Sequence, residues 1–254
     1  MAQAQAGVSL EQIMTQFLLS CLRLIGHGKT PWHDVLDVVV KGYRSAVFTV
    51  ALTSLFVGAI MVLEMNRELS GFGAEFALGG LATSLTLRNI GPVLLAFLLI
   101  GKMGTQTCAL LAAQASNLQL DAISLLGGSP LQWIVLPQFL GITLVGFLLL
   151  MLGLFFTSLG GIITAQAVLQ INSSQYVAEL GRFVGYDSLV LSMLKSAVFS
   201  FLIALNSAYF GSTALEGASH VGPAVRRAAV GSMLGVLTSN LLLTKLFDIL
   251  SSSS

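Results

Sequence analysis

Residues 45–63, SAVFTVALTSLFVGAIMVL, contain no charged side chain, and the stretch ends at Glu64. A helix needs about 20 mostly apolar residues to cross the hydrocarbon core of a bilayer. Only 9% of the 254 residues in the chain are charged, whereas soluble domains carry roughly 25%. The chain therefore lacks the charge that would cover a water-facing surface, and the sequence predicts a polytopic membrane protein.

A second apolar region, residues 76–120, contains only Arg88 and Lys102 as charged residues. It is too long for one perpendicular span at about 1.5 Å per residue. We expect one long or broken helix with its irregularity at Gly91-Pro92, because proline removes a helical hydrogen bond. Further spans are expected at residues 133–163, 189–214 and 229–247, which gives an all-α membrane protein with about five transmembrane helices.

The N-terminal region precedes these spans. Apolar residues recur at helical spacing within residues 10–28, which predicts an amphipathic helix in the membrane interface; packing on the bundle is the alternative. Residues 1–44 are thus expected to form a cytoplasmic or interfacial segment. Residues 45–250 are expected to form a single transmembrane domain, and residues 251–254 a disordered tail.

Lysine and arginine are distributed unevenly around the predicted spans. Arg23, Lys29, Lys41 and Arg44 precede the first span, and Arg226-Arg227 lies between the fourth and fifth. Because positive residues concentrate on the cytoplasmic side, this pattern predicts a cytoplasmic N-terminus and a cytoplasmic connection between spans two and three.

The composition excludes several functions. A net charge of +1 argues against nucleic acid, which needs clustered basic residues. The two cysteines and three histidines form no metal-ligand pattern. The chain has no P-loop and no HExxH or GxSxG motif, so we expect no catalytic site, metal or cofactor. A transport role powered by another subunit fits better than catalysis.

Three basic residues fall within apolar segments. Arg88 and Lys102 are 14 residues apart, so an unbroken helix would place both on one face, about 21 Å apart. Arg88 is suited to attract an anionic headgroup, and snorkelling toward the interface is the alternative. Lys195 lies near the start of the fourth span and is interpreted as a boundary anchor.

Residues 116–137, SNLQLDAISLLGGSPLQWIVLP, interrupt the apolar pattern. Leu118, Ala122, Leu125 and Leu126 can share one face of a short helix, which Gly127-Gly128 would end. Ser129-Pro130 would then begin the next helix, because proline is tolerated in a first turn. We expect a short helix along the membrane surface; a plain interhelical loop is the alternative.

Residues 87–139 resemble the central block of the MlaE/YrbE permease family. The agreement extends over four elements that the family writes approximately as LRELGP, GRxGSAxxAE, EQxDAL and MGxDPxxxLxxPR. A second block, GASHVGPAVRRAAV at residues 217–230, is similar to the family's GAEGVGxATTxAVV. In the first block the matching residues are Leu87, Arg88, Gly91, Pro92, Gly101, Gly104, Gln119, Asp121, Ala122, Gly127, Pro130 and Pro137.

The chain departs from the family pattern mainly at acidic positions. Asn89, Leu110, Leu118 and Ser219 stand where the family has glutamate, and Lys102 replaces an arginine. These departures indicate a divergent member. Its short surface helix would then be less polar than the family's usual version.

The resemblance implies a function and a set of partners. It implies a permease subunit, without a catalytic site of its own, that moves phospholipid or related lipid between the inner membrane and an MCE-domain partner, driven by ATP hydrolysis on a separate subunit. The subunit would work as a homodimer with an ABC ATPase and a hexameric ring of MCE-domain protein. An ATP-independent secondary transporter or a scaffold is the alternative.

The resemblance also implies two groups of site residues. The first group would bind the lipid near the mouth of a pocket at the dimer interface, and the second would form the coupling helix that contacts the ATPase. The lipid-binding residues are Arg88, Asn89, Gly91 and Pro92; the coupling residues are Leu118, Gln119, Asp121, Ala122, Leu125 and Gly127.

Overall fold

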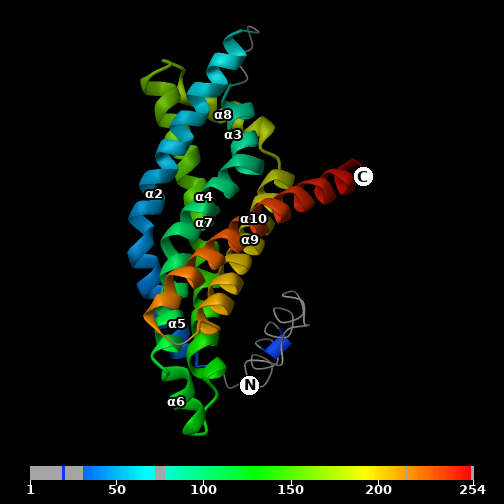
Figure 1. Cartoon of the computed structure of the whole chain (residues 1–254). Coiled ribbons are helices and arrows are strands. Elements are labelled where there is room, and N and C mark those ends of the chain that lie inside the picture. The colour runs from blue at the N-terminus through cyan, green and yellow to red at the C-terminus, as the bar shows by residue number, and fades with distance from the viewer. Residues whose placement is uncertain (1–18, 21–30, 72–77, 216, 253–254) are drawn as a thin grey trace.

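The computed structural model describes residues 19–20, 31–71, 78–215 and 217–252. Throughout this part of the chain the ordered elements are helices, and no strand occurs in it (Figure 1). Three five-residue segments are π-helical and are labelled η2, η3 and η4. In chain order the main elements are α2 (Trp32–Ser70), α3 (Leu78–Leu85), η2 (Thr86–Ile90), α4 (Gly91–Leu99), η3 (Ile100–Gly104), α5 (Thr105–Ser116), α6 (Gln119–Leu125), η4 (Leu131–Val135), α7 (Leu136–Ala167), α8 (Ser173–Phe183), α9 (Tyr186–Ser212), η5 (Ala218–His220, a short 3₁₀ turn) and α10 (Val221–Ser252).

Five helical stretches in the described residues are long and apolar enough to cross a membrane, which confirms the predicted fold class. The first starts at Trp32, so residues 32–44 continue without a break into the first predicted span. The second is one continuous helical rod that changes between α and π geometry. The stretches are Trp32–Ser70, Leu78–Ser116, Leu131–Ala167, Tyr186–Ser212 and Ala218–Ile249.

Two predictions fall largely at the chain ends. The amphipathic helix expected within residues 10–28 lies outside the described residues except for residues 19–20, which are helical. Helix α10 extends to Ser252, so the first two residues of the expected tail belong to a helix. Residues 253–254 lie outside the described part of the chain.

Close contact between backbones holds α2 against α7. A Cβ atom on Gly58 would lie 1.9 Å from the Thr157 carbonyl oxygen, and one on Gly160 would lie 2.2 Å from the Leu55 carbonyl oxygen. Neither distance is possible, so only glycine permits this crossing. Small residues bring helices together in this way inside membranes, where van der Waals contact replaces the hydrophobic driving force.

Helix α8 was not predicted from the sequence. Asn172 caps its first turn, accepting a hydrogen bond from the Ser174 amide at 3.1 Å, as expected for an N-cap asparagine. Tyr176 is buried against α3 and α7, and its hydroxyl lies 3.1 Å from Thr83 Oγ1. Burial raises the pKa of the Tyr176 phenol, although the hydrogen bond with Thr83 opposes that rise. Tyr176 thus attaches α8 to the end of the bundle opposite α6 (Figure 1).

Two of the π segments stand directly before a proline. Thr86–Ile90 precedes Gly91-Pro92, and Leu131–Val135 precedes Leu136-Pro137. In both cases the proline lacks the amide that would bond to the carbonyl at the centre of the π segment, four residues earlier. The expected irregularity at Gly91-Pro92 is therefore present, as a widened turn within a continuous helix.

Candidate functional site

The widened turn before Pro92 removes the α-helical donors of two backbone carbonyl groups. The Gly91 amide donates to the carbonyl of Thr86, five residues earlier, as in a π-helix. In an α-helix it would donate to the carbonyl of Leu87. The next possible donor for Leu87 is Pro92, which has no N–H. Pro92 is also the missing α-helical donor for the Arg88 carbonyl. Buried carbonyl groups need partners, and another element supplies donors to both.

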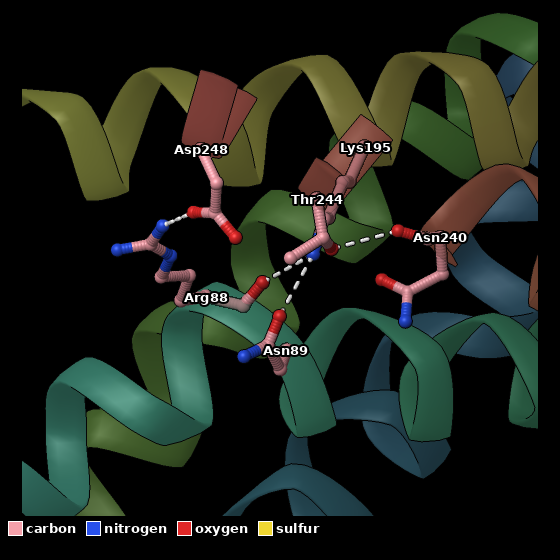
Figure 2. Close-up of polar contacts among 6 residues, drawn as sticks. All are labelled: Arg88, Asn89, Lys195, Asn240, Thr244 and Asp248. Atoms are coloured by element: carbon pink, nitrogen blue, oxygen red, sulfur yellow. Dashed lines mark hydrogen bonds and ion pairs between the residues drawn. The ribbon is translucent and has the colours of Figure 1, made fainter. Parts of the chain in front are cut away.

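Helix α9 supplies these donors from two side chains three residues apart. Lys195 Nζ donates to the Arg88 carbonyl oxygen at 2.5 Å and to Asn89 Oδ1 at 3.1 Å (Figure 2). Ser192 Oγ lies 2.8 Å from the Leu87 carbonyl oxygen and 2.7 Å from that of Ser188. Polar groups of one span thus donate to the carbonyl groups at the widened turn of another span.

The position of Lys195 corrects the interpretation of this residue as a boundary anchor. Its side chain is fully buried (0% exposed) within α9, well past the first turn at Tyr186. An ammonium group in such a place is costly unless it is hydrogen-bonded. Lys195 meets that condition through the Arg88 carbonyl and the Asn89 side chain.

Arg88 projects from the same widened turn toward α10. Its guanidinium forms an ion pair with the carboxylate of Asp248, and the two side chains are 33% and 50% exposed (Figure 2). A partly exposed arginine that pairs with a partly exposed aspartate is accessible to a competing anion. Guanidinium binds carboxylate and phosphate with similar geometry.

Three polar residues of α10 share one face at this site. Asn240, Thr244 and Asp248 are spaced four residues apart, and Figure 2 shows them opposite Arg88 and Asn89. Thr244 Oγ1 donates to the Asn240 carbonyl oxygen at 2.7 Å. Asn240 Oδ1 is buried and has no hydrogen-bond partner among the described residues. The site therefore holds one guanidinium and one unused acceptor.

The predicted lipid-binding residues take different positions here. Arg88 and Asn89 lie at the α10 contact, whereas Gly91 and Pro92 are buried. A Cβ on Gly91 would lie 2.6 Å from the Thr86 carbonyl oxygen and 3.1 Å from a methyl group of Leu154. Gly91 and Pro92 thus shape the backbone that presents Arg88.

Lys102 is not part of this cluster. It lies in η3, and the whole of α4 separates it from Arg88 in η2. The single face expected for Arg88 and Lys102 required an unbroken α-helix, and the two π segments remove that condition because each adds a residue to its turn.

The short helix expected between spans two and three is present as α6, at one end of the bundle (Figure 1). Leu125 and Leu126 are each 87% exposed, and Leu118 is 45% exposed. Gly127 ends the helix at φ +79°, and the Gly128 amide donates to the Ile123 carbonyl at 3.0 Å. Of the predicted coupling residues, Gln119, Asp121 and Ala122 are also exposed.

Leu118 adopts a left-handed conformation, φ 58°, between α5 and α6. For a branched side chain this conformation costs roughly 1–2 kcal/mol. The strain places an exposed leucine at the start of α6. No local sequence signal indicates it, since glycine or asparagine would be the usual choice.

Sequence reasoning did not identify Ser192, Asn240 or Asp248 as site residues. Asp248 lies just beyond the predicted end of the fifth span, at residue 247, so no sequence pattern places it near Arg88. The available signal was Pro92, because a proline inside a span requires donors from a neighbouring helix, and Ser192 and Lys195 are the polar residues of α9 that supply them.

Comparisons with known proteins cover most of the chain. A model of the permease family MlaE matches residues 36–246. A protein of Rickettsia felis called "Probable ABC transporter permease protein" is 29% identical over 198 residues, which cover 78% of this chain and 76% of that protein.

Two further relatives come from photosynthetic organisms. A "Probable ABC transporter permease protein" of Synechocystis is 29% identical over 193 residues, 76% of this chain and 73% of that protein. The Arabidopsis thaliana chloroplast protein called TRIGALACTOSYLDIACYLGLYCEROL 1 is 25% identical over 241 residues, 95% of this chain and 68% of that protein.

Proposed function

Because the chain belongs to the MlaE permease family, as a multi-pass membrane component of a transporter, we propose that it carries phospholipid or a related lipid. In this proposal the lipid passes between the inner membrane and an MCE-domain partner. ATP hydrolysis on a separate ABC subunit drives the movement, since the family role is that of a permease and implies an ATPase partner.

The ion pair of Arg88 with Asp248 carries the proposal. Both side chains are partly exposed, so a lipid phosphate can replace the carboxylate on the guanidinium without opening the core. The buried Asn240 Oδ1 has no partner among the described residues and can accept a hydrogen bond from an ammonium or hydroxyl of the headgroup. Asn89 is held in place by Lys195. Gly91 and Pro92 act by fixing the widened turn.

The exposed leucines of α6 support the proposed coupling to the ATPase. Leu118, Leu125 and Leu126 form an apolar surface at the end of the bundle. Solvent-exposed apolar clusters mark interaction surfaces. In the proposal, closure of the ATPase dimer pushes α6, and α6 transmits the push to α5 and to α7, which it connects.

Helix α10 supports a homodimer. It crosses the bundle obliquely and its C-terminal end projects from it (Figure 1). Large apolar residues along it are exposed, and a second copy of the chain would cover them next to the Arg88 site. These residues are Val230, Met233, Leu234, Leu237, Leu241, Leu242, Leu246 and Ile249.

The orientation follows from the basic residues. With α6 and the start of α2 in the cytoplasm, Lys41, Arg44, Arg226 and Arg227 lie on the cytoplasmic side. Arg88 and α8 then lie nearer the opposite face. A hexameric MCE ring would stand over that face of the dimer.

Reconstituted lipid transfer tests this function. Vesicles containing the chain, its ATPase and its MCE partner should transfer fluorescent phospholipid only when ATP is hydrolysed. Arg88→Ala should remove most of the transfer, whereas Arg67→Ala, an exposed arginine on the same side of the bundle, should not. Transfer that persists after loss of the ATPase's Walker lysine would favour an ATP-independent transporter or a scaffold instead.

A further inference from the structure

A cavity of about 380 Å³ lies between α2, α5 and α7 near the α6 end of the bundle. Met103, Thr107 and Ile142 are buried along its floor. Lys41 and Gln106 lie exposed at its rim. Cavities of roughly 300–1,000 Å³ are typical of ligand sites, and this one is at the opposite end of the bundle from Arg88.

The walls of this cavity carry polar groups that the protein itself does not use. Gln106 and Thr107 of α5 and Gln138 of α7 all line it. Within the described part of the chain, no residue hydrogen-bonds to these three side chains. Two amides and a hydroxyl facing one space can each donate and accept, as the ester and hydroxyl oxygens of a lipid require.

Lys41, at the rim, is paired with a carboxylate that lies one helical turn earlier on α2, outside the lining of the cavity. Lys41 Nζ lies 3.5 Å from Asp37 Oδ2, and both side chains are largely exposed. An exposed pair of this kind contributes little to stability, so a ligand can separate it at small cost. A zwitterionic headgroup offers a phosphate for Lys41 and an ammonium for Asp37.

The cavity also lies at the depth of a headgroup layer. The uncharged stretch of α2 begins at Ser45, which lines the cavity, and charged residues precede it. A phospholipid at this boundary would place its first methylenes over Met103 and Ile142. We propose that this cavity binds the headgroup of a zwitterionic, ethanolamine-type phospholipid from the leaflet on the α6 side.

The site is connected to α6 through two of its walls. Helix α6 lies between α5, which carries Gln106 and Thr107, and the α7 rod, which carries Gln138. In this proposal, a shift of α6 changes the distance between these walls. By linkage, a lipid in the cavity and a protein on α6 influence each other's binding. The linkage between the cavity and α6 rests on the proposed function, whereas binding of lipid in the cavity does not.

Photocrosslinking of the purified chain, without ATPase or nucleotide, tests occupation of the cavity. A benzophenone amino acid at Leu110, which lines the cavity and is 47% exposed, should label radioactive phosphatidylethanolamine. Lys41→Gln should lower the labelling about threefold to fivefold, as expected for one exposed ion pair. Arg44→Gln, which changes an exposed cation outside the cavity, should leave the labelling unchanged.

Two further variants distinguish lipid bound in this cavity from lipid that only surrounds the protein in the membrane. Gln138→Leu should lower labelling as well, and Ser45→Trp should abolish it by filling the cavity, with helicity by circular dichroism unchanged. Equal labelling by phosphatidylglycerol, or equal losses in the Lys41 and Arg44 variants, would overturn the proposal. Because the assay contains no ATPase, loss of lipid transfer in reconstituted vesicles would leave this result standing.

Discussion

Lys195→Met combined with Pro92→Ala tests the link between the widened turn and α9. Lys195 donates to the Arg88 carbonyl, whose α-helical donor would be the amide that Pro92 lacks. In the wild-type background, Lys195→Met leaves that carbonyl buried and unpaired, at a cost of about 1–3 kcal/mol. Removing a buried ammonium also relieves a desolvation penalty of several kcal/mol, so the net effect of the single variant is not decisive.

The coupling between the two substitutions is decisive. Pro92→Ala supplies an amide four residues after Arg88, so the carbonyl no longer depends on Lys195. We expect Lys195→Met to be about 1–2 kcal/mol less destabilising in the Pro92→Ala background, within the usual range for groups in contact. Unfolding in detergent by SDS titration, followed by circular dichroism, measures all four corners of the cycle. Additivity within about 0.5 kcal/mol would refute the reasoning.

Three further predictions concern packing, coupling and the ion pair. Gly160→Ala should destabilise the bundle by about 1–3 kcal/mol, measured by the same unfolding assay, whereas Gly101→Ala, where a Cβ meets no atom within 4 Å, should not. Leu125→Asp should abolish co-purification of the ATPase without changing helicity, and full retention of the ATPase would exclude α6 as the docking element. Asp248→Asn should strengthen binding of anionic lipid by about fivefold, the effect of one exposed ion pair, in a flotation assay; weaker binding would show that Asp248 supports the site instead of competing for it.

Much of the fold could be predicted because the bilayer dictates span length. Residues 45–63 indicate a span from the absence of charge alone, and Gly127-Gly128 correctly marks the end of α6. The start of α2 at Trp32 was missed because residues 32–44 carry charges that do not prevent a helix. Helix α8 was missed because its burial depends on Tyr176 reaching α3 and α7.

The candidate site was only partly predictable, because it depends on packing between segments that are distant in the sequence. Arg88 stands out as a charge within an apolar region, and Pro92 indicates a break in the helix. Which side chains pair with the carbonyl groups of that turn, and with Arg88, depends on how α9 and α10 pack against it. Lys195 and Asp248 are far from Arg88 in the sequence, so no local pattern brings them to Arg88.

In the proposed mechanism Arg88, released from Asp248, binds the phosphate of a lipid. A photoreactive amino acid at Thr244, one helical turn before Asp248 on the same face of α10 (Figure 2), can capture that lipid in the working transporter. We expect a phospholipid adduct that is lost in Arg88→Ala and retained in Arg182→Ala, an exposed arginine of α8. An adduct of equal yield in both variants would show that Arg88 does not hold the lipid phosphate.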